Sequence, residues 1–209
     1  MFKPENNPSP YDYLEDPAAA EDMRDEEASL LEQKLRAERR AETAEQESRT
    51  DPRTGLHNER AFDEQVDLLE SLARHNPGMA VRIDFIDLRG LGDFNDLSPE
   101  TGNQALREAA DGLREVYRRK GDFISRWGGD EFVVLRVNGD PRENVLAKLH
   151  HEMQGRSVAG RELDVYVGTA HWKPEGPRSN PTLAEVVDEA GKKQSVAKLA
   201  RKKQRKNAS

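Results

Sequence analysis

The chain of 209 residues contains no cysteine. This absence excludes disulfide bonds, thiolate metal sites and cysteine nucleophiles. The chain also has no apolar run long enough to span a bilayer, and its first residues lack the apolar segment of a signal peptide. We therefore expect a cytoplasmic protein with no membrane partner. A hydrophobic content of 34% beside a charged content of 35% allows one domain of ordinary size with polar extensions.

The composition changes along the chain. Residues 1–20 contain four prolines and favour a disordered arm. Residues 21–50 are rich in Glu, Arg and Ala and predict an acidic connecting helix, whose few leucines allow only a weak coiled coil. The turn sequence that starts at Asp51 marks the beginning of a folded domain over 51–203, and residues 204–209 end a basic tail.

The folded domain shows an ordered alternation of patterns. Strand-like runs cover residues 79–87, 123–127, 132–137 and 163–172. Helical patterns lie near 58–75, 103–119 and 141–154, and from about residue 182. The β-α-β-β-α-β order predicts an α/β fold of the α+β kind: a ferredoxin-like, palm-type core with flanking helices, preceded by an N-terminal helix. A right-handed crossover then places the third strand beside the first, so Asp87 and Asp130 should meet at one sheet edge.

Residues 126–132 read Arg-Trp-Gly-Gly-Asp-Glu-Phe and carry the clearest functional signal. Glycines between two strand-like runs predict a tight hairpin turn, and they leave room beside the backbone for a phosphate. Asp130 and Glu131 at this turn would lie near Asp87. A bound cation would offset the repulsion among these negative charges. Mg²⁺ is commonly held by one or two carboxylates and substrate phosphates, so this pattern predicts a metal site for phosphoryl transfer.

Residues 51–203 resemble the GGDEF domains of bacterial diguanylate cyclases, and residues 128–132 are the signature itself. The sequences at 51–60 and 165–170, and the spacing from Asp87 to Asn95, resemble other parts of the family pattern. The resemblance implies that two GTP molecules condense to cyclic di-GMP with loss of pyrophosphate. It also implies a homodimer in which each domain holds one GTP.

The resemblance further assigns roles to individual residues. It implies Mg²⁺ or Mn²⁺ as cofactor, held by Asp87, the Leu88 carbonyl and Asp130, with Asp130 and Glu131 as the catalytic carboxylates. It implies GTP contacts at Asn95, Asn103, Gly128, Gly129, Lys198 and Lys202. It also implies an inhibitory site for cyclic di-GMP at Arg119 and Asp122, where arginine offers a planar fork to phosphate or guanine.

Several positions depart from the family pattern. Arg89 replaces a second aspartate, Gly92 replaces a lysine near the phosphates, and Asn103 replaces an aspartate that accepts two hydrogen bonds from guanine. An amide has one acceptor oxygen, so mixed use of GTP and ATP is a further hypothesis.

These departures leave two alternatives beside the cyclase. One is a degenerate domain that acts as a cyclic di-GMP receptor or protein-interaction module. The other, with least support, is a nucleic-acid-associated or scaffold protein that uses the basic tail. Because that tail is short and carries no interleaved aromatic residues, we expect no nucleic-acid partner.

Overall fold

The computed structural model describes residues 28–40, 44, 48–76, 78–139, 144–174 and 181–207, with side chains described up to residue 200. The chain divides into two compact units, Met1–Ser48 and Arg49–Ser209. In the first unit residues 28–40 form a helix whose leucines at 30, 31 and 35 are exposed. The arm predicted over residues 1–20 lies outside the described residues.

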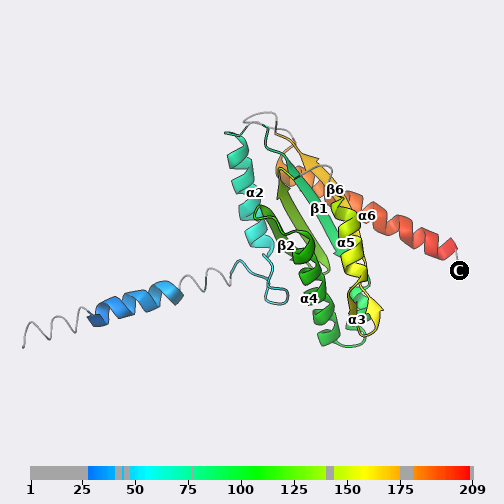
Figure 1. The fold of residues 1–209 in the computed structure, drawn as a ribbon, viewed down its shortest axis with the longest axis horizontal. Coiled ribbons are helices and arrows are strands. Elements are labelled where there is room, and N and C mark those ends of the chain that lie inside the picture. Colours follow the sequence, from blue (N-terminus) through cyan, green and yellow to red (C-terminus); the bar gives the residue numbers. More distant parts are fainter. Residues whose placement is uncertain are drawn as a thin grey trace, which may run out of the picture. The chain divides into compact units, whose positions relative to one another are not determined.

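The second unit is built on a four-stranded antiparallel sheet with the order β2-β3-β1-β6 (Figure 1). β1 (Val81–Leu88) lies between β3 (Glu131–Val137) and β6 (Val165–Trp172), and β2 (Asp122–Gly128) forms an edge. This is the strand order that the sequence predicts, so the ferredoxin-like arrangement is confirmed. The register places Asp87 opposite Glu131.

Helices cover both faces of the sheet, as Figure 1 shows. α4 (Pro99–Val116) and α5 (Val145–Gln154) pack on the face that carries Ile86, Leu88, Phe132 and Val134. α2 (Glu59–Ala73) and α6 (Leu183–Asn207) pack on the face that carries Ile83, Phe85, Val133 and Leu135. Side chains alternate between faces along a strand, so the continuous apolar run of the central strands supplies two cores at once.

Capping side chains set where the helices begin. The Ser98 hydroxyl accepts a hydrogen bond from the Thr101 amide at 3.0 Å, and Pro99 occupies the first turn. Because these are strong N-terminal signals, α4 starts four residues earlier than the pattern from residue 103 predicts. Asn58 and Asn144 cap α2 and α5 in the same way.

Three short elements were not predicted. α3 (Leu91–Asn95) follows β1 directly, and β4 (Ser157–Val158) pairs with β5 (Arg161–Glu162) in a small hairpin before β6. Elements of two to five residues are too short to show a hydrophobic period. β6 itself begins at Val165, two residues later than predicted.

Gly168 brings α6 into direct contact with the backbone of β6. A Cβ at this position would lie 2.0 Å from the Ala190 carbonyl oxygen and 2.3 Å from the Gln194 nitrogen. Only a residue without a side chain allows this approach. The contact fixes the distance between α6 and the sheet.

Candidate active site

The glycine turn forms as the sequence predicts. β2 ends at Gly128, β3 begins at Glu131, and Gly129 adopts a φ of 50°. The Leu88 amide donates a hydrogen bond of 2.8 Å to the Asp130 carbonyl, which ties the turn to the end of β1. The backbone of the turn is therefore fixed against the strand that carries Asp87.

Three carboxylates and one ammonium group meet at this sheet edge. Lys198 on α6 places its Nζ 2.5 Å from Oδ2 of Asp87 and 4.0 Å from Oδ2 of Asp130. Glu131 is the cross-strand neighbour of Asp87. The structure thus brings together residues from the end of β1, from α6 and from the hairpin, and the three carboxylates outnumber the single positive charge.

The electrostatics of the cluster follow from this crowding. The pKa of Glu131 is raised above its ordinary value by burial, then by the charges of Asp130 and Asp87, while Lys198 opposes the shift. Burial alone would lower the pKa of Lys198, but its hydrogen bond to Asp87 and the surrounding negative charges raise it. The cluster therefore favours an additional positive charge.

The donor set fits a hard divalent cation. Carboxylate oxygens of Asp87 and Asp130 and the Leu88 carbonyl are the ligand types that Mg²⁺ and Mn²⁺ prefer. Among the described residues, no group of three or more His, Cys, Asp or Glu side chains is arranged to hold a metal alone.

Arg126 was not among the predicted site residues. Its guanidinium group fixes the backbone of the glycine turn by hydrogen bonds. Its Nε and Nη2 donate to the Gly129 carbonyl at 3.2 and 2.6 Å, and its Nη1 donates to Asp51 at 2.9 Å. The other oxygen of Asp51 accepts hydrogen bonds from the amide and hydroxyl of Thr54. One buried guanidinium therefore joins the first loop of the domain to the hairpin. Its position in the heptad was the only sequence signal.

Two of the predicted nucleotide contacts lie together beside the start of α4. Oδ1 of Asn95 occupies the space above Gly102, where a Cβ would approach it to 1.8 Å. Asn103, the next residue, hydrogen bonds to Glu100. Together with the stronger contact from Arg107, this bond lowers the pKa of the Glu100 carboxyl. Asn95 ends α3 and Asn103 lies near the start of α4, so the fold places both residues where these two helices meet.

A sequence model described as "Diguanylate cyclase, GGDEF domain" matches residues 48–204. The chain belongs to the GGDEF domain family. The relatives include the diguanylate cyclase DgcP of Escherichia coli, 30% identical over 74% of this chain and 41% of that protein. They also include the cyclic di-GMP phosphodiesterase NbdA of Pseudomonas aeruginosa, 39% identical over 66% of this chain and 18% of that protein. The chain thus spans less than half the length of these two relatives.

Solved structures share the fold of this GGDEF domain. The coiled coil and GGDEF domain of DgcB from Caulobacter crescentus, in complex with c-di-GMP, matches with a TM-score of 0.76 at 20% identity. The match covers 85% of this chain and 95% of that chain. Within the described part of this chain, no helix is both long and apolar enough to cross a membrane.

Of the two lysines expected at the phosphates, only Lys198 can be placed. It lies at the carboxylate cluster, as described above. Lys202 continues α6 one turn further, and its side chain lies outside the described residues.

The expected product site of this GGDEF domain has an inward-facing carboxylate. Oδ1 of Asp122 accepts a hydrogen bond of 3.1 Å from Arg136, and Oδ2 accepts one of 3.1 Å from the Arg119 amide. The Asp122 side chain is 1% exposed, whereas Arg119 is exposed. Beside them lies a cavity of about 380 Å³ lined by Glu115, Val116, Arg118, Arg119, Arg136, Lys148, His151 and Glu152. Asp122 therefore shapes the turn and orients Arg136, while the arginines face the cavity.

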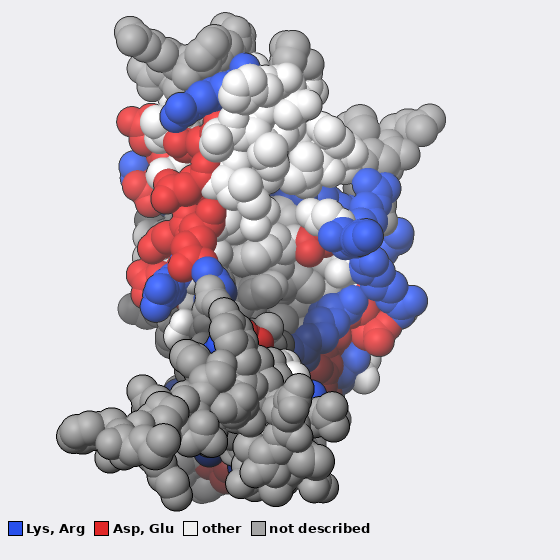
Figure 2. Space-filling view, turned by 90° about the vertical axis from the view of Figure 1, so that its left-hand side faces the viewer, with Lys and Arg blue, Asp and Glu red and all other residues white. Residues whose placement is uncertain are grey.

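Charge is unevenly distributed on the surface. Figure 2 shows most of the Asp and Glu on the left of one face and most of the Lys and Arg on the right, with a largely uncharged band between them. Such separation attracts phosphate-bearing ligands to the basic side and directs them away from the acidic side.

Proposed function

We propose that this GGDEF domain is a diguanylate cyclase that condenses two GTP molecules into cyclic di-GMP with release of pyrophosphate. The observation that carries the proposal is the meeting of Asp87, Asp130 and Glu131 beside a glycine turn with Lys198 among them. A domain that only bound a protein partner would not need three clustered carboxylates, one of which, Glu131, has a raised pKa. The family membership supports the same conclusion.

The proposed roles follow from the positions of the side chains. Asp87, the Leu88 carbonyl and Asp130 would hold Mg²⁺ or Mn²⁺, which would neutralise charge on the α-phosphate of GTP. Gly128 and Gly129 leave the backbone open to the phosphates. Lys198 would exchange its contact with Asp87 for the terminal phosphate, since a bound cation replaces its charge.

Glu131 is proposed as the base. Its raised pKa gives it greater affinity for a proton than an ordinary carboxylate has, which suits removal of a proton from a ribose hydroxyl. The 3′ oxygen then forms a bond to the α-phosphorus, and the bond from that phosphorus to the pyrophosphate oxygen breaks. Asn95 and Asn103 are proposed to contact the guanine, with a weaker discrimination against adenine because the Asn103 amide offers one acceptor oxygen where a carboxylate offers two.

A homodimer is part of the proposal, because each domain has one such cluster and the reaction joins two nucleotides. The helix of residues 28–40 exposes Leu30, Leu31 and Leu35, at spacings that could pair two copies weakly. The solved structure of DgcB in complex with c-di-GMP also contains a coiled coil and a GGDEF domain.

The first experiment incubates the purified full chain with GTP and Mg²⁺ and separates the nucleotides by chromatography. Asp130→Asn removes one charge from the cluster, and Asp67→Asn on the exposed side of α2 makes the same change elsewhere. We expect cyclic di-GMP from the wild type and from the Asp67 variant, and none from the Asp130 variant. Absence of product from folded, ligand-free wild type would refute the cyclase proposal.

We also propose that cyclic di-GMP inhibits the domain by binding in the cavity beside Arg119. The basic lining of this cavity supports the proposal, and Arg119 rather than Asp122 would make the direct contacts. Arg119→Ala should abolish inhibition by added product without changing the initial rate. If the wild type binds cyclic di-GMP but makes none, the altered positions Arg89, Gly92 and Asn103 favour the second candidate, a cyclic di-GMP receptor.

A further inference from the structure

At the end of the sheet opposite the hairpin, three neighbouring strands carry basic residues in register. Arg82 on β1 is the cross-strand partner of Arg136 on β3 and of His171 on β6. Like charges at directly opposite positions destabilise a sheet. The positive charge of this row must therefore be offset, either by carboxylates of the protein or by a bound anion.

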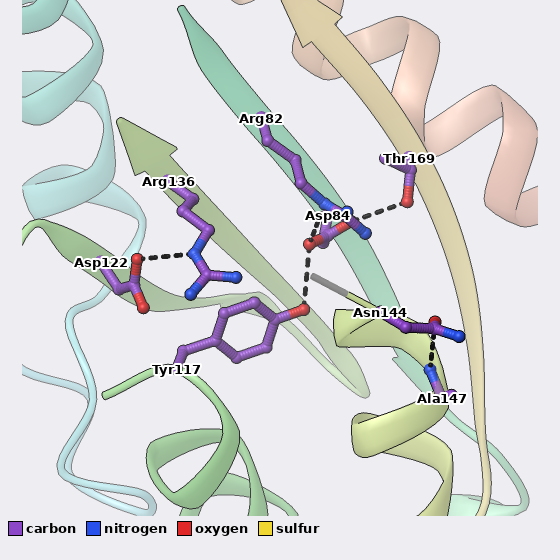
Figure 3. Close-up of polar contacts among 8 residues, drawn as sticks. All are labelled: Arg82, Asp84, Tyr117, Asp122, Arg136, Asn144, Ala147 and Thr169. Carbon is purple, nitrogen blue, oxygen red and sulfur yellow. Dashed lines mark hydrogen bonds and ion pairs between the residues drawn. The ribbon is translucent and has the colours of Figure 1, made fainter. Parts of the chain in front are cut away.

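Buried carboxylates supply part of the compensation, as Figure 3 shows. Asp84 accepts hydrogen bonds from Arg82 (2.9 Å from Nε), from the Thr169 hydroxyl (2.6 Å) and from the Tyr117 hydroxyl (3.0 Å). Both carboxylates, Asp84 here and Asp122 against Arg136, have side chains that are 1% exposed.

The two guanidinium groups are held in fixed orientations by these contacts. Arg136 also lies over the Tyr117 ring, 5.8 Å from its centroid. Arg82 and Arg136 keep 17% and 2% of their side-chain surface exposed. The folded protein therefore already fixes the conformations of both arginines. A ligand would bind them without a further loss of side-chain entropy.

A cavity of about 510 Å³ opens beside these arginines. It is lined by Ala80, Arg82, Arg136, Asn138, Gly139, His171 and Lys173, and none of these described lining residues is acidic. Its volume lies in the range of small-molecule sites. Two arginines, one lysine and one histidine thus line this space, and the carboxylates bonded to the two arginines, Asp84 and Asp122, are not among its lining residues.

We propose that this cavity is a binding site for a small phosphate-bearing anion. The positive charges of Arg82 and Arg136 attract phosphate oxygens although Nε and Nη2 of Arg82 already donate to Asp84, and Lys173, which is exposed, adds a mobile charge. Arg82 and Asp87 are five residues apart on β1, a distance of about 17 Å at the rise of a strand. The cavity is therefore separate from the carboxylate cluster, and the proposal does not depend on cyclase activity.

His171 provides a reporter inside the cavity. Burial lowers its pKa first, and the positive charges of Arg82, Lys173 and Lys193 lower it further, while Asp84 opposes them. An anion bound among these groups would offset the positive charges, so it should raise the pKa of His171.

The test is a titration of the full chain with inorganic pyrophosphate in metal-free buffer, followed by NMR of backbone amides and histidine rings. We expect saturable shifts at Asn138, Gly139 and Lys173 and a higher pKa for His171. Lys173→Gln should weaken this binding about tenfold, as expected for one lost charge-assisted contact. Lys192→Gln, an exposed residue of α6 outside the cavity lining, should leave it unchanged.

Pyrophosphate could also bind at the hairpin or beside Arg119, and the shifts distinguish these outcomes. Saturable shifts confined to Gly128 and Gly129 or to the Arg119 turn, or no saturation by about 1 mM, would overturn the proposal. Equal binding by the Lys173 and Lys192 variants would also overturn it. Both substitutions alter exposed side chains, and amide spectra of the unliganded variants verify that each is folded.

Discussion

Replacing Arg126 with lysine tests whether the glycine turn depends on a fork of donors rather than on a positive charge. Lysine keeps the charge near Asp51, but it cannot donate to Asp51 and twice to the Gly129 carbonyl at the same time. Hydrogen bonds that involve a charged group contribute about 1.5–3 kcal/mol each, so we expect a net loss of about 2 kcal/mol. The Arg126 side chain is 6% exposed, so water cannot fully replace the lost bonds.

Thermal unfolding and turnover measure the two consequences. For a domain of this size 1 kcal/mol corresponds to about 2–4 °C, so Arg126→Lys should lower Tm by about 4–8 °C. Turnover of GTP should fall by at least about tenfold, because Asp130 and Glu131 are positioned by the turn. Arg60→Lys makes the same exchange in an exposed ion pair of α2 and should change neither quantity.

A double-mutant cycle with Asp51→Asn isolates the interaction between the two side chains. If Arg126 and Asp51 stabilise the turn through their mutual contact, the two substitutions together should destabilise the domain by less than the sum of their separate effects. Additive effects, or an Arg126→Lys variant that unfolds and turns over like Arg60→Lys, would refute the reasoning.

Four further predictions concern single side chains. Tyr117→Phe removes a hydrogen bond to a buried carboxylate and should cost about 1.5–3 kcal/mol by denaturant unfolding. The raised pKa of Tyr117, caused first by burial, stabilises the folded state below pH 10, so this difference should shrink as pH rises above that value. Glu131→Gln should raise Tm at pH 7 in metal-free buffer, because the folded state raises the pKa of Glu131; the gain should disappear below pH 4.5, where the glutamate is protonated in both states. Lys198→Gln should tighten Mg²⁺ binding in calorimetry without nucleotide, since a competing cation is removed, yet raise the KM for GTP. Gly102→Ala should displace the Asn95 side chain and raise the KM for GTP while leaving Tm unchanged or higher.

The sheet and the hairpin could be predicted because their signals are local. Alternating and continuous apolar runs identified the four long strands, and two glycines identified the turn. Strand order followed from the handedness of crossovers, and with it the meeting of Asp87 and Asp130. α3 and the β4-β5 hairpin were missed because elements so short carry no period.

Other features depend on contacts between distant segments. Asp84 lies in an apolar strand, and nothing nearby in sequence identifies Tyr117 and Thr169 as its partners. Asp122 is the cross-strand partner of Arg136, and this opposite-charge pair turns its carboxylate inward. The role of Arg126 likewise depends on Asp51, 75 residues away. Such pairs become visible only when the fold brings their strands and loops together.

The position of Lys198 beside the carboxylates depends on an uncharged residue, Gly168. α6 rests on the backbone of β6 at this glycine, and Lys198 lies four residues beyond Gln194, about 6 Å along the helix axis. A single methyl group at Gly168 would push the helix outward and carry the ammonium away from Asp87. A Gly168→Ala variant keeps every carboxylate and lysine of the cluster. It should nevertheless lose the contact between Lys198 and Asp87, because one added carbon atom displaces α6.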